Sequence, residues 1–275
     1  MSTLKQLLQT GREILKQQGI ADADVDAWYL LAHVFDLKRT DMIIKGDTLA
    51  DESKSENYLM FIQQRCEHIP LQHITGSQEF MGLEFVVSAD VLVPRQDTEV
   101  LVQEVLENCE NKSVLDMCTG SGCIIISLAK LGKLTRAVGA DLSKGALAVA
   151  AENVKRHQVS VELLQSNLFS KVEGSFDILV SNPPYIPTRD IDELMPEVKD
   201  YEPHMALDGR EDGLEFYRQI SSAGKKQLNK GGLIFYEIGY NQGEAVKQIL
   251  MSEGFTDVMI KKDLSGLDRV VRARW

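Results

Sequence analysis

The chain has 275 residues, of which 44% are hydrophobic and 26% are charged, and its formal net charge is −11 at pH 7. This composition is that of an ordinary globular protein and excludes disordered and fibrous classes, and the length suffices for a large α/β domain with a small accessory domain. The acidic balance disfavours stable binding to nucleic acid, because sequence-independent attraction to phosphates depends on clustered Lys and Arg.

Helical periodicity marks the first 70 residues of the chain. Apolar residues recur there three and four positions apart, which predicts a small helical bundle with these residues in its core. They are Leu4, Leu7, Leu8 and Leu15, then Val25, Trp28, Tyr29, Ala32 and Phe35, then Tyr58, Leu59, Ile62 and Cys66. Gly19 and Gly46 are expected to end helices, and Asp51 or Ser53 to cap the last one.

A change of pattern follows the bundle. Short β-prone runs around Gly76 and Gly82 predict a hairpin, so we expect a helical domain at 1–70, a hairpin linker at 71–95 and a second domain at 96–275. Strands are expected in the second domain at 113–116, 137–140, 161–164, 176–181 and 233–238, with two more at the end, and helices begin near residues 97, 123, 143, 213 and 241. This alternation predicts a mostly parallel, doubly wound sheet whose ligands bind at the carboxyl ends of its strands.

A glycine-rich turn follows the first of these strands, where residues 116–122 read Asp-Met-Cys-Thr-Gly-Ser-Gly. Its glycines allow the backbone to turn sharply and to approach a ligand closely. A dinucleotide-binding sequence would have a third glycine at position 125, which is Ile125, so the pattern favours S-adenosylmethionine over NAD. Asp141, at the end of the next strand, can accept hydrogen bonds from both ribose hydroxyls. Asp116 places a carboxylate near the cationic end of this cofactor, although an acid here also commonly caps the following turn.

The sequence Asn182-Pro183-Pro184-Tyr185 stands at the carboxyl end of the strand at 176–181. Because proline restricts φ and lacks an N–H, the turn holds the Asn182 side-chain oxygen and the Pro183 carbonyl as fixed acceptors. Two acceptors facing one NH₂ group suit a planar amide or aryl amine, and they align its nitrogen for attack on a sulfonium methyl. Tyr185 can cover the planar face of that group. The alternative is a proline-rich loop that only closes a strand, which the preceding glycine turn and strand-end acid argue against.

Together these segments resemble the HemK/PrmC family of protein-(glutamine-N5) methyltransferases, and the likeness extends over most of the chain. It is carried by residues 70–76, 80–82, 93–99, 115–123 and 182–185, and by Glu202-Pro203, Ala206-Leu207, Asp212-Gly213-Leu214, Glu237-Ile238-Gly239 and Asp268-Arg269. The resemblance implies a seven-stranded Rossmann-like class I methyltransferase domain and a helical domain that helps to dock a peptide chain release factor. It also implies methylation of the Gln in the factor's GGQ motif, a step that belongs to translation termination.

The resemblance further implies which positions form the site. Cofactor contacts are expected from Asp116, Thr119, Gly120, Ser121, Gly122, Asp141, Asn167, Leu168 and Asn182. Catalysis and substrate binding are expected from Asn182, Pro183, Pro184 and Tyr185. Two positions depart from the family's pattern: Gln96-Asp97 stands where Pro-Glu is more common, and Asn167 stands where an acid commonly faces the adenine amino group. An Asn carbonyl can still accept that hydrogen bond.

Two other functions fit part of this pattern. N6-adenine methyltransferases of DNA or RNA share the Asn-Pro-Pro-Tyr sequence, but residues 1–85 hold 8 Lys and Arg against 13 Asp and Glu, and so lack a basic accessory region. A non-catalytic nucleotide-binding or scaffold protein would have no need of Asn182 and Pro183.

The remaining features predict no metal and no membrane association. The four cysteines have neither CxxC spacing nor suitably placed histidines, and we expect them to be reduced packing residues: Cys66, Cys109, Cys118 and Cys123. The longest apolar run, at 123–129, is far shorter than the ~20 residues of a membrane span, and residues 1–9 carry no long apolar stretch. A cytosolic location is therefore expected.

Overall fold

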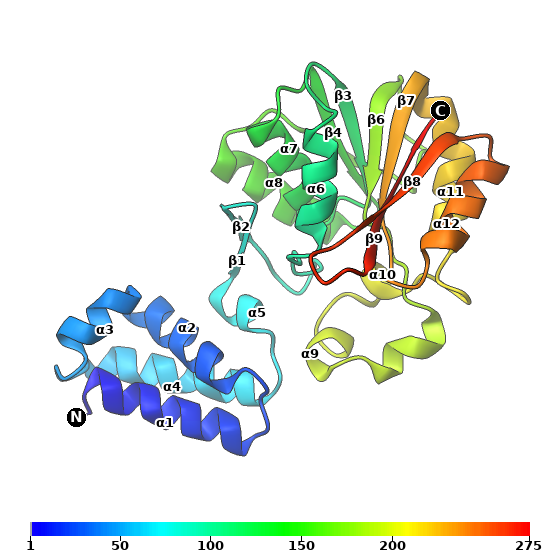
Figure 1. Cartoon of the computed structure of the whole chain (residues 1–275). Coiled ribbons are helices and arrows are strands. Elements are labelled where there is room, and N and C mark those ends of the chain that lie inside the picture. The colour runs from blue at the N-terminus through cyan, green and yellow to red at the C-terminus, as the bar shows by residue number, and fades with distance from the viewer. Residues whose placement is uncertain (1) are drawn as a thin grey trace. The chain divides into compact units, whose positions relative to one another are not determined.

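The computed structural model describes residues 2–275, which divide into two compact units. The helical unit comprises the chain up to Gly76 together with Met195–Tyr201, and the α/β unit comprises Ser77–Leu194 and Glu202–Trp275 (Figure 1). Within residues 2–275, no helix is long and apolar enough to cross a membrane.

The helical unit is built from α1 (Leu4–Gln17), α2 (Ala23–Phe35), α3 (Arg39–Lys45), α4 (Glu52–Cys66), α5 (Leu71–Thr75) and α9 (Pro196–Lys199). Helices α1, α2 and α4 lie side by side, and the predicted apolar positions Leu15, Trp28 and Tyr58 are buried between them (Figure 1). The expectation that Val25, Tyr29 and Leu59 also face this core is wrong: they are 46%, 52% and 39% exposed, because α2 and α4 each turn only one face inward.

A buried arginine joins three separate parts of the helical unit. Arg65 of α4 pairs with Asp26 of α2 at 2.7 Å and with Glu197 of α9 at 2.8 Å. His68 Nδ1 also lies 3.2 Å from Glu197, and the Tyr201 hydroxyl donates a hydrogen bond to the carbonyl of residue 67. The segment Met195–Tyr201 therefore belongs to the helical unit, although it lies far along the chain.

A seven-stranded mixed sheet forms the centre of the α/β unit, in the order β5-β4-β3-β6-β7-β9-β8. Its strands are β3 (Ser113–Met117), β4 (Arg136–Asp141), β5 (Glu162–Gln165), β6 (Phe176–Ser181), β7 (Leu228–Glu237), β8 (Thr256–Lys262) and β9 (Asp268–Arg274). The first five strands in this order pair in parallel, and β9 is antiparallel to both of its neighbours. A separate hairpin, β1 (Ser77–Phe80) with β2 (Leu83–Val86), precedes the sheet. The predicted doubly wound sheet is confirmed.

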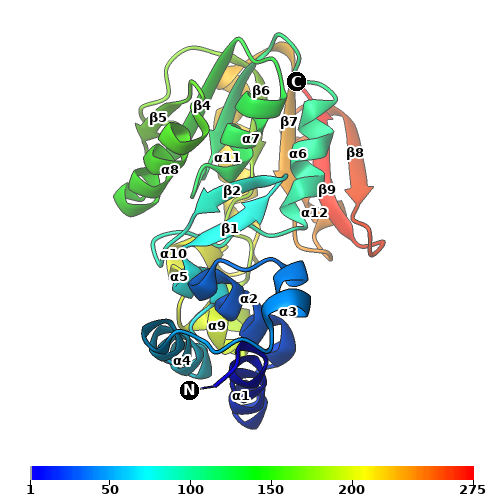
Figure 2. The same cartoon turned by 90° about the vertical axis from the view of Figure 1, so that its left-hand side faces the viewer.

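Alternate residues of each strand point to opposite faces of the sheet, and both faces are apolar. Helices therefore cover both of them. Helices α6 (Thr98–Leu106) and α7 (Cys123–Leu131) pack with Val114 and Val180, and α8 (Lys144–His157) lies beside α7. Helices α11 (Glu215–Gly224) and α12 (Gly243–Ser252) pack with Leu115 and Leu179 on the other side (Figures 1 and 2). Between β6 and α11 the chain forms only short helices, which are α9, α10 (His204–Leu207) and a 3-10 helix at Thr188–Glu193.

Strand β7 begins at Leu228 and not at the expected residue 233. Its pairing with β6 shifts, so that Phe176 faces Leu228 whereas Ile178 faces Leu233. Four residues, 229–232, therefore lie opposite Asp177 alone and form a bulge, which includes Gly231, with a φ of +78°, and Gly232. Glycines inside a strand weaken the local strand signal and commonly mark a bulge, which is why the sequence pattern indicated a later start for this strand.

Candidate active site

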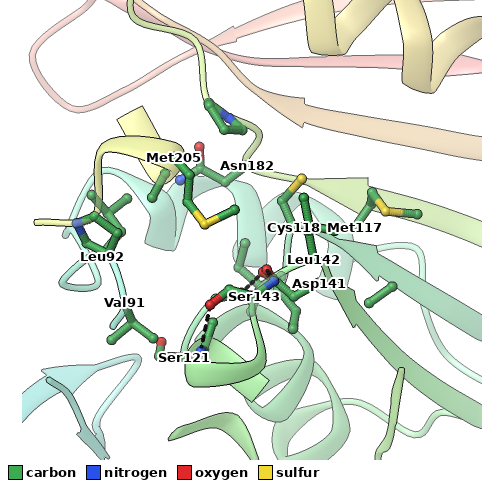
Figure 3. A pocket seen from close by; sticks show the side chains of 18 of the residues that line it. Val91, Leu92, Met117, Cys118, Ser121, Asp141, Leu142, Ser143, Asn182 and Met205 are labelled. Atoms are coloured by element: carbon green, nitrogen blue, oxygen red, sulfur yellow. Dashed lines mark hydrogen bonds between the residues drawn. The ribbon is translucent and has the colours of Figure 1, made fainter. Parts of the chain in front are cut away.

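A cavity opens at the carboxyl ends of β3, β4 and β6 in the α/β unit (Figure 3). Strands β3 and β6 are neighbours in the sheet, and the chain continues from them in opposite directions, which is where such sheets bind ligands. Of the predicted site residues, the cavity is lined by Thr119, Gly120, Ser121, Asp141, Asn167, Leu168, Asn182 and Pro184. Asp116, Gly122, Pro183 and Tyr185 are not among its lining residues.

The two glycines of the turn after β3 differ in what surrounds them. Gly120 has a φ of +57°, and a Cβ there would meet nothing within 4 Å, so this residue leaves open space on the cavity wall. Gly122 has a φ of +79°, and a Cβ there would lie 2.8 Å from Ile126 Cδ1 and 3.3 Å from Ala150 Cβ. A Cβ at Gly122 would therefore crowd the contact between α7 and α8, whereas Gly120 gives a ligand access to the backbone.

We expect Gly122→Ala to lower the free energy of unfolding by about 1–3 kcal/mol, because the added methyl group overpacks the contact with Ile126 and Ala150. The matched control is Gly231→Ala, whose φ is also positive but whose Cβ would meet nothing within 4 Å. Urea denaturation should show a smaller loss, of about 1 kcal/mol, in the control. Equal losses in the two variants would show that backbone conformation alone requires Gly122.

Asp141 presents a carboxylate at the end of β4 on the cavity wall (Figure 3). Its Oδ2 accepts the backbone N–H of Gly120 at 2.9 Å, and its Oδ1 accepts that of Ser143 at 2.9 Å. Burial raises the pKa of Asp141, and these backbone hydrogen bonds act against that rise. Each carboxylate oxygen retains capacity for a further donor, so this side chain can accept bonds from two hydroxyl groups.

Asp116 lies below the turn and outside the cavity. Its Oδ2 accepts a hydrogen bond from the Thr119 hydroxyl at 2.6 Å, and burial raises the pKa of Asp116 to about 7. These contacts are those of an acid that caps the turn, which was the alternative interpretation of this residue. Because Asp116 does not line the cavity, it could affect a bound cation only at a distance, through the electric field of its carboxylate or through the shape of the turn.

The Asn-Pro-Pro-Tyr turn brings two of its four side chains to the cavity. Asn182 and Pro184 line it, and the Asn182 Nδ2 lies 3.5 Å from the Thr98 Oγ1. The Tyr185 hydroxyl points instead toward Glu237, whose Oε1 it approaches at 3.4 Å. Burial raises the pKa of Tyr185 well above its usual value. Tyr185 lines a neighbouring groove that shares Arg210 with the cavity.

An ion pair between the half-exposed Arg95 and the buried Glu202 joins two walls of the cavity, and neither residue was expected in the site. Glu202 accepts two hydrogen bonds from Arg95 Nη2, at 2.8 and 2.7 Å, and one from the backbone N–H of Val93 at 3.2 Å. Burial raises the pKa of Glu202, and Arg95 acts in the opposite direction. The pair holds Pro94, Arg95, Pro203 and Met205 at the cavity, and the sequence signal for it was the family resemblance of residues 93–99 and of Glu202-Pro203.

Apolar side chains complete the cavity. Val91, Leu92, Leu142, Met205 and Phe216 line it, and none of them was expected in the site. Figure 3 shows Asn182 and Met205 on one side of the cavity and Asp141 with Ser143 on the other. The cavity thus offers hydroxyl acceptors at one end, an amide at the other, and apolar surface for a flat ring.

Comparisons with known proteins point to one family over nearly the whole length of the chain. The family model described as the PrmC N-terminal domain matches residues 6–76, and the methyltransferase small domain matches residues 85–197. A release factor glutamine methyltransferase of Geobacter sulfurreducens is 40% identical over 274 residues, which are 99% of this chain and 96% of that protein. The protein of the same name from Clostridium acetobutylicum is 41% identical over 278 residues, and the match covers 98% of each chain.

Solved structures share the fold of the α/β unit. A methyltransferase from Pyrococcus furiosus superposes with a TM-score of 0.55 at 17% identity, covering 71% of this chain and 90% of that chain. The 16S rRNA N2 G1207 methyltransferase of T. Thermophilus gives a TM-score of 0.50 at 18% identity, covering 72% of this chain and 49% of that chain. These likenesses show a Rossmann-like class I methyltransferase fold, as the family resemblance implied.

Proposed function

The chain belongs to the family of release factor glutamine methyltransferases, and on that premise we propose that it methylates the side-chain amide nitrogen of the Gln in the GGQ motif of peptide chain release factors. The methyl donor is S-adenosylmethionine, and the reaction takes place in the cytoplasm. The observation that carries the proposal is the position of Asn182 in the same cavity as Gly120 and Asp141.

The residues of the cavity fit S-adenosylmethionine. Asp141 is placed to accept the ribose hydroxyls, the open space at Gly120 admits a ligand against the backbone, and Leu142 and Phe216 offer apolar surface to an adenine ring. Asn167 and Leu168, on the loop after β5, are placed to contact the same ring. When bound, the cofactor supplies a methyl group on a positively charged sulfur.

The turn at Asn182 would perform the positioning that this chemistry needs. An amide nitrogen is a poor nucleophile, because its lone pair is delocalised into the carbonyl. The side-chain oxygen of Asn182, a residue that lines the cavity, would accept one of its N–H hydrogens, which aligns the nitrogen and stabilises the positive charge that develops on it. The Pro183 carbonyl would accept the other, although Pro183 does not line the cavity. The nitrogen would bond to the methyl carbon as the carbon–sulfur bond breaks, and it would then release a proton to water. No general base is required before the attack.

Methylation of adenine in nucleic acid is the rival function, because an exocyclic amine meets the same two acceptors. The net charge of −11 opposes it, and the family relatives of nearly equal length are named for release factors. Incubation with labelled S-adenosylmethionine and a release factor, duplex DNA or RNA separates these functions. We expect label on the release factor alone, with mass spectrometry placing a single methyl group on the Gln of its GGQ motif.

Asp141→Ala is expected to weaken S-adenosylmethionine binding by about 1–3 kcal/mol, because two hydroxyl donors lose their charged acceptor. Calorimetric titration measures this change directly. Asp90→Ala is the matched control, since Asp90 also lines the cavity but its carboxylate bonds to Ser88. If Asp90→Ala weakens binding as much as Asp141→Ala does, the negative charge of the cavity holds the cofactor, and hydrogen bonding by Asp141 does not.

A further inference from the structure

Asn153 of α8 is fully buried, does not line the cavity, and joins two segments that do. Its Nδ2 donates hydrogen bonds to the backbone carbonyls of Val86 and Ser121, both at 3.0 Å. Its Oδ1 accepts the backbone N–H of Val86 at 2.7 Å. Only one orientation of the amide places its oxygen at this N–H and its NH₂ group at both carbonyls, so the three bonds together define that orientation.

The two bonds to Val86 anchor the segment that follows β2. Val86 is the last residue of that strand, and a few residues further on Val91 and Leu92 line the cavity (Figure 3). The segment also passes close to the first turn of α8, because a Cβ added at Gly145 would lie 2.6 Å from Asp90 Oδ1. This wall of the cavity is therefore held along α8, with its start fixed by the two bonds to Val86.

The bond to Ser121 acts on the glycine turn. Ser121 lines the cavity, and its carbonyl belongs to the same peptide unit as the N–H of Gly122. That N–H donates to the Thr119 carbonyl at 2.8 Å. Because a peptide unit is planar, it cannot rotate here without breaking the hydrogen bonds on both of its sides. The bond from Asn153 therefore removes a freedom that glycine, with its wide range of backbone angles, would otherwise allow.

We infer that Asn153 is a positioning residue for the methyl donor, because it holds the glycine turn and the segment after β2 in their places before the cofactor binds. A site that is in its binding conformation for only part of the time binds more weakly, since Kd rises in inverse proportion to the population of that conformation. Asn153 acts only through the two segments that it joins. The inference rests on the proposed function, from which it takes S-adenosylmethionine as the ligand.

Asn153→Leu tests the inference, because leucine has nearly the size of asparagine and makes no side-chain hydrogen bond. We expect calorimetric titration to show a Kd for S-adenosylmethionine that is about tenfold higher, which corresponds to a binding conformation populated about a tenth of the time. The kcat at saturating cofactor should stay within about threefold of wild type, because the bound cofactor restores the walls. A residue needed only for stability would lower the melting temperature and leave Kd unchanged.

The matched control is Val154→Ala, at the next position of α8. Its side chain packs in the apolar cluster around α7, so the variant weakens the same helix and removes no hydrogen bond. We expect a lower melting temperature and a Kd within about twofold of wild type. An equal rise of Kd in the two variants would overturn the inference, because general weakening of α8 would then explain both.

Hydrogen exchange in the wild-type protein tests the same coupling without any substitution. If the bonds of Asn153 favour binding of the cofactor, the bound cofactor must favour those bonds by the same factor. The Val86 N–H should therefore exchange about tenfold more slowly at saturating S-adenosylmethionine. The N–H of Asn111, which donates to the Lys133 carbonyl before the amino end of β3, controls for a general gain in stability. Equal slowing at both positions would contradict the coupling.

The outcomes for Asn153 stay distinct from those for the proposed function. A wild-type protein that does not bind S-adenosylmethionine refutes the proposed cofactor, and one that binds it but leaves the release factor unlabelled refutes the proposed substrate. If wild type binds the cofactor and Asn153→Leu binds it equally tightly, only the role of Asn153 is refuted.

Discussion

Replacement of Asn182 by Ala is expected to lower the rate of release factor methylation by roughly 10² or more, with little change in cofactor affinity. The variant loses the side-chain oxygen that we propose as an acceptor for the substrate amide. That acceptor acts mainly in the transition state, when the nitrogen becomes positively charged and its N–H groups become stronger donors. The variant should therefore have a lower kcat.

Single-turnover rates at saturating cofactor, combined with calorimetric titration of S-adenosylmethionine, check this expectation. Asn167→Ala is the matched control, because Asn167 lines the same cavity on the loop after β5, away from the Asn-Pro-Pro-Tyr turn. It should weaken cofactor binding and leave the rate at saturation close to wild type. Near-normal turnover by Asn182→Ala would show that this side chain does not carry catalysis.

Deletion of residues 1–70 is expected to lower kcat/KM for the intact release factor on the order of 10², while a short peptide containing GGQ loses much less. One side-chain amide buries little surface, so recognition of a folded substrate has to come from contacts far from the reacting nitrogen. The helical unit can supply them. Ile43, Ile44 and Leu49 lie exposed in and after α3, and the first two are 82% and 78% accessible. Clustered exposed apolar residues commonly mark interaction surfaces.

A point variant makes the same test without shortening the chain. Deletion would leave Met195–Tyr201 without the partners that it packs against in the helical unit. Ile43→Asp combined with Ile44→Asp preserves those partners, and we expect it to weaken methylation of the intact factor and to spare the peptide. Cofactor affinity and thermal unfolding serve as controls for both variants. Equal loss with factor and peptide would mean that the catalytic unit itself is damaged.

The site residues that the sequence predicts best are those at the ends of the parallel strands. Periodicity placed β3, β4 and β6 within a residue or so, and the glycine turn, Asp141 and Asn182 followed because parallel strands end at one edge of the sheet. These strands stand out in the sequence as short, nearly continuous apolar runs, because helices cover both faces of the sheet. The pattern failed at Gly231, where a bulge interrupts β7.

The other walls of the cavity depend on contacts between residues far apart in the sequence, which the spacing of residues does not predict. The ion pair between Arg95 and Glu202 joins residues more than 100 positions apart in the sequence. No local pattern shows that these two side chains meet. Nothing in the sequence indicated that the Tyr185 hydroxyl faces Glu237, since Tyr185 was expected to cover the planar face of the substrate group. Asp116 also fitted two interpretations in the sequence, and its hydrogen bond from the Thr119 hydroxyl matches that of an acid that caps the turn.

The buried pairs of Arg65 have a consequence for the order in which the protein is made. A nascent chain that has emerged as far as residue 100 contains Asp26 and Arg65 but not Glu197, which follows 132 residues after Arg65. The helical unit therefore leaves the ribosome with one partner of its central arginine missing. It can complete its ion pairs only after β3 to β6 have been synthesised, so the first part of the chain to emerge finishes folding after part of the sheet is available.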